Sequence, residues 1–214
     1  MKYKAVLFDM DGTVLDTIGD LTDSMNHSLE HFGYPPITEE QAKAGLGNAA
    51  RHYCACSVPG DISPERFEEF FEYYRAWYNA HSLIKTAPYE GILQLAADLE
   101  KAGCRCAIIS NKPDPTVKIL SDRFFRGMPA IGESEKVKRK PDPSSVLEML
   151  RELGVDKADA VYIGDTEVDI ATAVNAGMDC IAVSWGFRTR QQLVDAGAAV
   201  IADTVQQLEA LLLA

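Results

Sequence analysis

The sequence predicts an α/β fold: a doubly wound, Rossmann-like parallel sheet with a small all-helical domain inserted after the first strand. Three observations lead to this prediction. Short apolar runs alternate with amphipathic helical patterns through most of the 214 residues. The runs are almost wholly apolar, as in strands that are covered on both faces. The alternation stops between about residues 16 and 85, where only helical patterns occur.

The predicted strands are apolar runs of three or four residues. Such runs, separated by helical patterns, are typical of parallel strands joined by helical crossovers. Five runs qualify, at Ala5–Phe8, Cys106–Ile109, Val161–Ile163, Ile181–Val183 and Ala199–Ile201.

The predicted helices lie between and after these strands, and several carry start or stop signals. Asp142 precedes the start of one helix, which ends at Gly154, and Gly177 ends another. Asp203 and Thr204 open the last one. The six helical patterns are Ile92–Lys101, Pro115–Arg123, Pro143–Leu153, Val168–Ala176, Gln191–Ala196 and Val205–Leu213.

The segment that interrupts the alternation contains helical patterns at Ile18–Phe32 and at the aromatic stretch Phe67–Tyr78. A glycine-rich break, Gly45-Leu46-Gly47, lies between them. We therefore predict two domains. Residues 1–15 and 86–214 form the α/β core, and residues 16–85 form a helical cap.

Composition restricts the partners of the protein. Thirty-two acidic against 21 basic residues give a net charge of −11. Such a surface repels nucleic acid and anionic lipid, so we expect a small-molecule partner, with neither nucleic acid nor membrane bound. Five cysteines without metal-ligand spacing are typical of reduced thiols. With no signal or membrane-spanning pattern visible, the expected location is the cytoplasm. The sequence leaves monomer and dimer open.

The first strand ends in the motif D-x-D-G-T, from Asp9 to Thr13. Successive residues of an extended strand alternate sides, so Asp9 and Asp11 start on the same side. Open α/β sheets bind ligands at the carboxyl ends of their strands. Gly12 allows the chain to bend away after the two carboxylates.

A second strand end supplies two more acids, Asp165 and Asp169. Helix capping by Asp165 would explain one of them but not Asp169, a turn further on. If Asp9 and Asp11 converge with this pair, the four carboxylates repel one another. Two carboxylates ~4 Å apart, at an effective dielectric constant of ~20, repel by about 4 kcal/mol. A hard divalent cation relieves that repulsion, and oxygen ligands favour Mg²⁺.

Two further segments add groups that suit a phosphate. Ser110 and Asn111 follow a third strand, where a hydroxyl and backbone amides precede a helix. Lys140 precedes the helix that begins near Pro143, and the following Pro141 favours an extended backbone.

The ordered set D-x-D-G-T, strand-Ser, Lys-Pro-Asp-Pro and G-D-x-x-x-D resembles the haloacid dehalogenase-like hydrolase superfamily, over nearly the whole chain. The helical insert and Gly186-Phe187-Arg188 resemble its phosphoglycolate phosphatase branch. The resemblance implies four catalytic residues: Asp9, Asp11, Ser110 and Lys140. It implies a magnesium site formed by the side chains of Asp9 and Asp165, the backbone carbonyl of Asp11, and Asp169 directly or through water.

The resemblance also implies a mechanism. Asp9 attacks phosphorus to form an aspartyl phosphate, and Asp11 protonates the leaving oxygen and later deprotonates water. An aspartate at the position of Asp11 argues against a dehalogenase, since a halide needs no proton. The expected activity is hydrolysis of a small phosphomonoester, with phosphoglycolate as the first candidate. A β-phosphoglucomutase-like phosphotransferase and an inorganic pyrophosphatase of the same superfamily remain alternatives.

The cap loop resembles the family's specificity loop. Its Gly47-Asn48-Ala49 departs from the Gly-Asn-Gly expected in the phosphoglycolate branch. Arg51 follows in the first turn of an expected helix, where a cation is unfavourable unless an anion lies nearby. We therefore expect substrate to be bound by residues of this loop and of the core: Gly47, Asn48, Arg51, Ser110, Asn111 and Lys140. Two interpretations of Arg51 stay open, because its side chain is either solvated or in contact with a second anionic group of the substrate.

Overall fold

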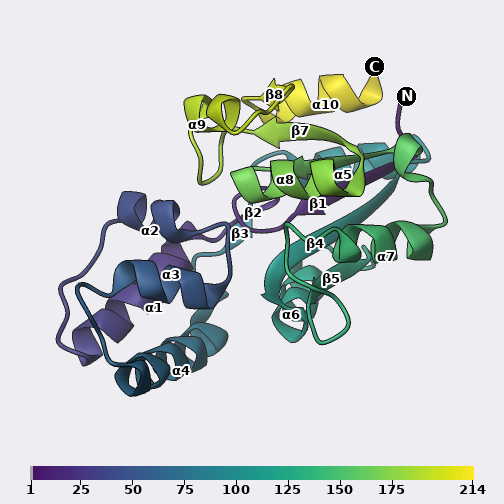
Figure 1. The fold of residues 1–214 in the computed structure, drawn as a ribbon. Helices are drawn as coiled ribbons and strands as arrows, with labels where there is room; N and C mark the ends of the chain where they lie inside the picture. Colours follow the sequence, from purple (N-terminus) through teal and green to yellow (C-terminus); the bar gives the residue numbers. More distant parts are fainter. Residues whose placement is uncertain (1) are drawn as a thin grey trace.

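The computed structural model describes residues 2–214 and contains a six-stranded sheet in which every strand pair is parallel (Figure 1). The strand order is β5-β4-β1-β6-β7-β8. The strands are β1 (Ala5–Asp9), β4 (Arg105–Pro113), β5 (Ala130–Glu133), β6 (Ala160–Gly164), β7 (Asp179–Val183) and β8 (Ile201–Ala202). The predicted doubly wound parallel sheet is confirmed.

The chain order reverses at β1, because β4 and β5 lie on one side of it and β6 to β8 on the other. Such a switch point leaves a crevice at the carboxyl ends of the strands, where open α/β sheets bind their ligands. The D-x-D motif follows β1, so the topology puts these acids at that crevice.

Alternating side chains of the strands are buried against helices on the two faces of the sheet. Val6 and Phe8 pack with α5 (Ile92–Lys101), α6 (Asp114–Phe124) and α10 (Val205–Leu213). Ala5 and Leu7 pack with α7 (Ser144–Leu153) and α8 (Glu167–Ala176). Burying each large apolar side chain contributes about 1.5–3 kcal/mol. The short α9 (Arg190–Asp195) packs beside β7 through Leu193 and Ala182.

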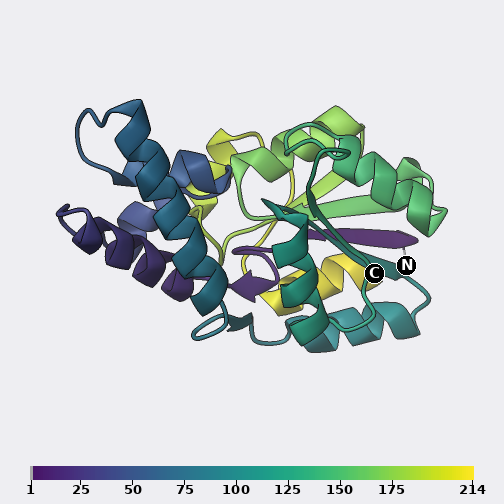
Figure 2. The same cartoon turned by 90° about the horizontal axis from the view of Figure 1, so that it is seen from below.

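Four further helices form a separate group beyond the carboxyl ends of the strands (Figures 1 and 2). We call them the helical group: α1 (Ile18–His31), α2 (Glu39–Gly45), α3 (Ala50–Ser57) and α4 (Pro64–His81). They bury a second hydrophobic cluster that includes Met25, Leu29, Phe70 and Tyr74, and Phe187 from the loop after β7 joins it. Both chain termini lie at the opposite end of the molecule (Figure 2).

Two short chain segments connect the helical group to the sheet. They pair as antiparallel strands, β2 (Leu15–Asp16) and β3 (Ala87–Pro88). Asp20, buried in the first turn of α1, accepts hydrogen bonds from the backbone N–H groups of Ile84, Lys85 and Thr86. The two connections therefore run side by side and are tied together.

The structure differs from the sequence prediction at several elements. The strands β2, β3 and β5 and the helix α2 were not predicted, β4 extends to Pro113, and β8 begins at Ile201 and not at Ala199. β5 has the sequence Ala-Ile-Gly-Glu, which contains too few apolar residues to stand out. A short 3-10 turn, Lys157–Asp159, precedes β6. Within residues 2–214, no helix combines the length and apolarity needed to cross a bilayer.

Candidate active site

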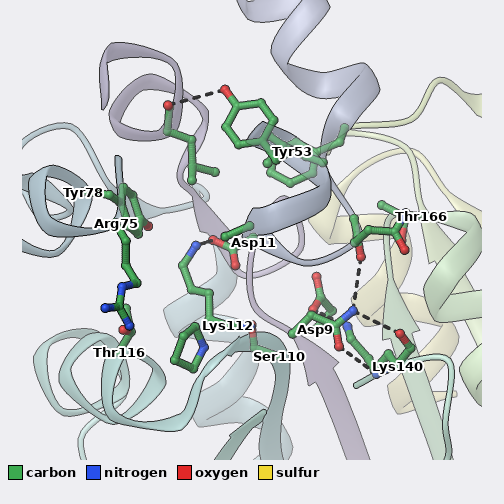
Figure 3. A pocket seen from close by; sticks show the side chains of 18 of the residues that line it. Asp9, Asp11, Tyr53, Arg75, Tyr78, Ser110, Lys112, Thr116, Lys140 and Thr166 are labelled. Carbon is green, nitrogen blue, oxygen red and sulfur yellow. Dashed lines mark hydrogen bonds and ion pairs between the residues drawn. The ribbon is translucent and has the colours of Figure 1, made fainter. Parts of the chain in front are cut away.

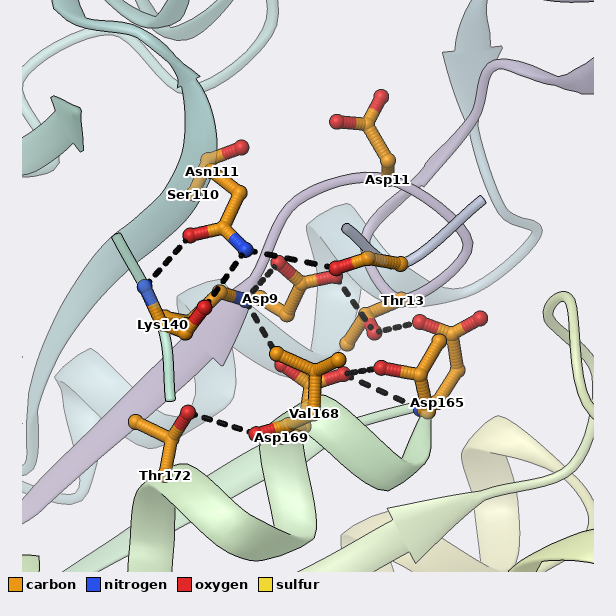
Figure 4. Close-up of polar contacts among 12 residues, drawn as sticks. Asp9, Asp11, Thr13, Ser110, Asn111, Lys140, Asp165, Val168, Asp169 and Thr172 are labelled. Carbon is orange, nitrogen blue, oxygen red and sulfur yellow. Dashed lines mark hydrogen bonds and ion pairs between the residues drawn. The ribbon is translucent and has the colours of Figure 1, made fainter. Parts of the chain in front are cut away.

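Three acids converge at the carboxyl end of the sheet (Figure 4). Asp9 is the last residue of β1, Asp165 follows β6, and Asp169 lies in the first turn of α8. One carboxylate oxygen of each lies within 4.8 Å of the others, and all three side chains are buried. Residues more than 150 positions apart in the chain therefore share one site because β1 and β6 are neighbours in the sheet.

The carboxylate of Asp165 is held by two donors. It accepts hydrogen bonds from the Thr13 hydroxyl at 3.0 Å and from the backbone N–H of Phe187 at 2.6 Å. Gly12, at φ +83°, passes so close that a Cβ there would lie 2.3 Å from Asp165 Oδ2. The glycine of the D-x-D-G-T motif is thus required for both its backbone conformation and the space it leaves.

Asp169 forms the cap of α8, which corrects the sequence interpretation. Thr166 is the N-cap residue, and its backbone N–H and hydroxyl donate to Asp169 Oδ2 at 3.1 and 2.7 Å. Helix capping, which the sequence offered as an alternative explanation for Asp165, involves Asp169 instead. The cap also fixes the direction of the Asp169 side chain, so that its other oxygen faces the site.

Lys140 reaches the acids from the loop before α7. Its ammonium donates to Asp9 Oδ1 at 2.6 Å, to Asp169 Oδ1 at 2.7 Å and to the Tyr162 hydroxyl at 3.1 Å. Asn111 holds the lysine's backbone, because its side chain accepts from Lys140 N–H at 2.7 Å and donates to Lys140 O at 3.2 Å. Asn111 was expected to bind substrate, and in this structure its amide positions Lys140.

The site carries more negative than positive charge. Three buried carboxylates surround one ammonium, and Lys140 lies against only two of them. Burial, followed by the charges of Asp169 and Asp11, raises the pKa of Asp9 to about 7 despite the opposing charge of Lys140. Burial and the charges of Asp9 and Asp169 raise the pKa of Asp165 well above its ordinary value. Such an unneutralised set of oxygen donors fits a divalent cation.

Asp11 lies apart from this cluster. Its carboxylate accepts from the ammonium of Lys112 at 2.7 Å, and both side chains are largely buried. The Lys112 ammonium also lies 4.9 Å from the centre of the Tyr78 ring in α4. Burial alone would lower the pKa of Lys112, but the charge of Asp11 raises it. Sequence reasoning missed Lys112, although it directly follows Ser110 and Asn111.

A cavity lies between the helical group and the sheet (Figure 3). Ser110, buried at its base, accepts from the Lys112 N–H at 3.2 Å. The helical group contributes apolar and aromatic side chains, among them Tyr53, Tyr74 and Tyr78. Eight of the predicted site residues line the cavity: Asp9, Asp11, Gly47, Asn48, Ser110, Asn111, Lys140 and Asp169.

Arg51 does not lie among the lining residues. Its guanidinium pairs with the Glu68 carboxylate at 2.6 Å and lies against the rings of Phe67 and Phe71. The sequence indicated that a cation at this helix start is unfavourable unless an anion lies near Arg51. That anion is the carboxylate of Glu68. Arg75 lines the cavity instead, on the side of α4 (Figure 3). Like Arg51 it also pairs with a glutamate, Glu72, and no local feature of the sequence marked it as a site residue.

Comparison with known proteins agrees with this geometry. Residues 6–183 match the family model described as haloacid dehalogenase-like hydrolase. The chain is 30% identical to phosphoglycolate phosphatase 1 of Pseudomonas aeruginosa, over 96% of this chain and 78% of the relative. It is also 30% identical to N-acetylmuramic acid 6-phosphate phosphatase of the same species, over 97% of this chain and 94% of the relative.

Solved structures show the same architecture. A Lactobacillus delbrueckii subsp. bulgaricus protein, provisionally described as a phosphoglycolate phosphatase, superimposes with a TM-score of 0.95 and 37% identity over 99% of both chains. CbbY from Rhodobacter sphaeroides, solved with xylulose-(1,5)-bisphosphate, superimposes with a TM-score of 0.75 and 25% identity over 94% of both chains.

Proposed function

This chain belongs to the haloacid dehalogenase-like hydrolase family and is a phosphatase, and we propose that it hydrolyses a small phosphomonoester through an aspartyl phosphate on Asp9, with Mg²⁺ as cofactor. The observation that carries the proposal is the convergence of Asp9, Asp165 and Asp169 with Lys140 beneath a cavity. A phosphate dianion needs concentrated positive charge, and an acidic protein must supply it locally.

The carboxylates of Asp9, Asp165 and Asp169 and the backbone carbonyl of Asp11 are the proposed ligands of Mg²⁺. Their oxygen-only chemistry and their surplus of negative charge support this choice of metal. When bound, Mg²⁺ supplies the positive charge that offsets the developing charge on a transferring phosphoryl group.

Asp9 is the proposed nucleophile. Its carboxylate oxygen forms a bond to phosphorus while the bond from phosphorus to the leaving oxygen breaks. We propose that Lys140 and the Ser110 hydroxyl hold the phosphoryl oxygens, and the contact of Lys140 with Asp9 and the position of Ser110 in the cavity support this.

Asp11 is the proposed proton carrier. It gives a proton to the leaving oxygen and then takes one from the water that attacks the aspartyl phosphate, which frees Asp9 and releases phosphate. The position of Asp11 at the cavity but outside the acid cluster supports a role different from that of Asp9. Lys112 would keep the Asp11 side chain directed into the cavity.

We further propose that residues 16–85 act as a cap domain over the core of residues 1–15 and 86–214. The separate hydrophobic cluster of the helical group and its two adjacent connections support this division. Five free cysteines are in accord with a cytoplasmic location.

Phosphoglycolate is the first candidate substrate, because relatives with this activity match nearly the whole chain. A sugar phosphate is the second, favoured by the aromatic side chains of the cavity and by the N-acetylmuramic acid 6-phosphate phosphatase relative. Aromatic faces suit the apolar faces of sugar rings and have no partner in a two-carbon acid.

A substrate panel tests the proposal. Phosphate release is measured with Mg²⁺ for phosphoglycolate, N-acetylmuramic acid 6-phosphate, a hexose 1-phosphate and pyrophosphate, with a chelator-treated sample as control. We expect hydrolysis of at least one phosphomonoester and loss of it with chelator. Conversion of the hexose 1-phosphate to an isomer would identify a phosphotransferase instead. Full activity in the metal-free protein would contradict the proposed cofactor.

A further inference from the structure

Arg188, in the loop between β7 and α9, joins the sheet to the helical group. Its Nη1 donates to the carbonyl oxygen of Lys43 at 2.7 Å, and its Nη2 donates to that of Leu46 at 2.8 Å. Both carbonyls lie at the end of α2, where the last carbonyls of a helix need further donors, and that of Lys43 also accepts from the Leu46 N–H at 3.2 Å. The residue is only 8% exposed.

The opposite side of the same guanidinium is fixed to the core. Its Nε and Nη2 donate to the two carboxylate oxygens of Glu167, at 2.7 and 2.9 Å. Glu167 is the first residue of α8, the helix that also carries Asp169. A planar guanidinium presents several donors in fixed directions and so matches both oxygens of a carboxylate, whereas an ammonium lacks this fork.

The segment held by Arg188 forms one wall of the cavity. Leu46, Gly47 and Asn48 all line it. A weaker hydrogen bond, from Asn111 to Gly47 O at 3.4 Å, also joins this segment to the core, and Gly47 lies so close to Thr166 that an added Cβ would come within 3.1 Å of its side chain. Gly47 has φ +102°, so both its conformation and its contact with the core favour glycine.

We infer that Arg188 is a positioning residue that holds residues 43–48 against the core and thereby keeps Gly47 and Asn48 over the reacting groups. The expected effect on turnover rests on the proposed function, whereas the holding of residues 43–48 does not. A loop held at the cavity wall excludes water and aligns a substrate without touching the phosphoryl group. Arg188 touches neither Asp9 nor Lys140 in the hydrogen bonds of the structure.

Hydrogen exchange and kinetics together test this role in Arg188→Leu and Arg188→Lys. We expect amides of residues 43–48 to exchange faster in Arg188→Leu, while α1 and α4 keep their wild-type protection. We expect kcat/KM to fall about 10- to 100-fold, as for the loss of a charged hydrogen bond. Arg188→Lys should keep part of the amide protection and part of kcat/KM, because lysine has the positive charge but not the planar, forked set of N–H donors.

Arg190→Leu is the matched control. Arg190 lies two residues away, pairs with Asp203 across the surface, and should leave the exchange of residues 43–48 and kcat/KM unchanged. If Arg188→Leu does not fold, Glu167→Gln weakens one side of the same contact and should give a smaller change in the same amides.

Two outcomes would overturn the inference. Wild-type exchange of residues 43–48 in Arg188→Leu would show that Arg188 does not hold the segment. Faster exchange spread equally over α1 to α4 would show a general structural role. An inactive wild-type protein would contradict the proposed function alone, since the exchange result would still decide the role of Arg188.

Discussion

The two aspartates of the D-x-D motif lie two residues apart but have different surroundings. Asp9 lies in the acid cluster and accepts from Lys140. Asp11 lies outside that cluster and accepts from Lys112. Carboxylates that must perform different chemistry in one site are commonly separated in this way. The contrast shows that the two carboxylates are in different environments, as two different roles require, and each proposed role has its own test.

The first residue-scale prediction concerns Asp9→Asn. An amide cannot form an acyl phosphate, so we expect turnover to fall by more than about 1,000-fold. Folding should be preserved, because the change removes one charge from a crowded buried cluster. Steady-state phosphate release and a thermal melt measure the two effects. Wild-type-like hydrolysis by this variant would exclude Asp9 as the nucleophile.

The second prediction concerns Asp11→Asn. Phosphoenzyme formation should slow far more with an alkyl phosphate than with p-nitrophenyl phosphate, because nitrophenolate leaves without a proton. Single-turnover measurements with the two substrates compare these rates. Equal slowing for both would count against Asp11 as the proton donor.

The third prediction follows from the position of Arg51. Its guanidinium is held by Glu68 and two aromatic rings outside the cavity. We therefore expect Arg51→Ala to change kcat/KM by less than about 3-fold for phosphoglycolate and for p-nitrophenyl phosphate, and to lower stability by about 1 kcal/mol or less. Arg75→Ala is the comparison, because Arg75 lines the cavity. A loss in Arg51→Ala that is selective for phosphoglycolate would restore the original expectation.

At the scale of elements, the connection between the helical group and the sheet depends on one buried carboxylate. Asp20 in α1 accepts from three consecutive backbone N–H groups and from the Thr86 hydroxyl at 2.8 Å. Buried hydrogen-bond donors without acceptors lower the stability of a fold. Asp20 supplies the acceptor for this segment, which forms no helix and pairs with no strand at these residues. β2 and β3, each two residues long, lie side by side next to this contact.

The element-scale prediction is that Asp20→Ala lowers the free energy of unfolding by about 2 to 4 kcal/mol, because it leaves the buried backbone N–H and hydroxyl of Thr86 unpaired. Urea unfolding measures the change. Asp23→Ala is the matched control, since Asp23 lies on the same helix but makes an exposed pair with Lys85 and should cost about 1 kcal/mol or less. If both substitutions lower the free energy of unfolding by similar amounts, the buried contacts of Asp20 contribute no more to stability than an exposed ion pair.

At the scale of the whole molecule, the balance of charge links stability to the metal. The chain has a net charge of −11 and also concentrates carboxylates in its interior. Because the pKa of Asp9 is raised to about 7 in the folded protein, the metal-free fold binds a proton that the unfolded chain releases. That contribution to stability is present at low pH and is lost as the pH rises through about 7.

The whole-molecule prediction is that Mg²⁺ raises the melting temperature more at a pH of about 8 than at about 5.5, because protons compete with the metal for the same carboxylates. At roughly 100 times its Kd, we expect Mg²⁺ to raise the melting temperature by about 5 to 10 °C at the higher pH. Calorimetry with and without the metal measures this. An equal or larger shift at the lower pH would contradict the proposed ligands.

The sequence by itself determined the fold class and the segments that build the reaction centre. Periodicity predicted α5 and α10 with their observed bounds and placed β1, β6 and β7 to within two residues. Apolar runs and helix stops are local features of the chain, so they can be read without a structure. The strand ends that carry Asp9, Ser110 and Asp165 follow from the same pattern, because parallel strands place their carboxyl ends at one edge.

The tertiary structure alone decided which side chains meet across the cavity. Lys112 and Asp11 are 101 residues apart, and Arg188 and Leu46 are 142 residues apart. The first contact depends on the pairing of β4 with β1, and the second depends on how the helical group lies against the sheet, so nothing local in the sequence encodes either. The same reason separates Arg51 from Arg75. Which arginine faces the cavity depends on the packing of α3 against α4, where Glu68 and two aromatic rings hold Arg51 away from it.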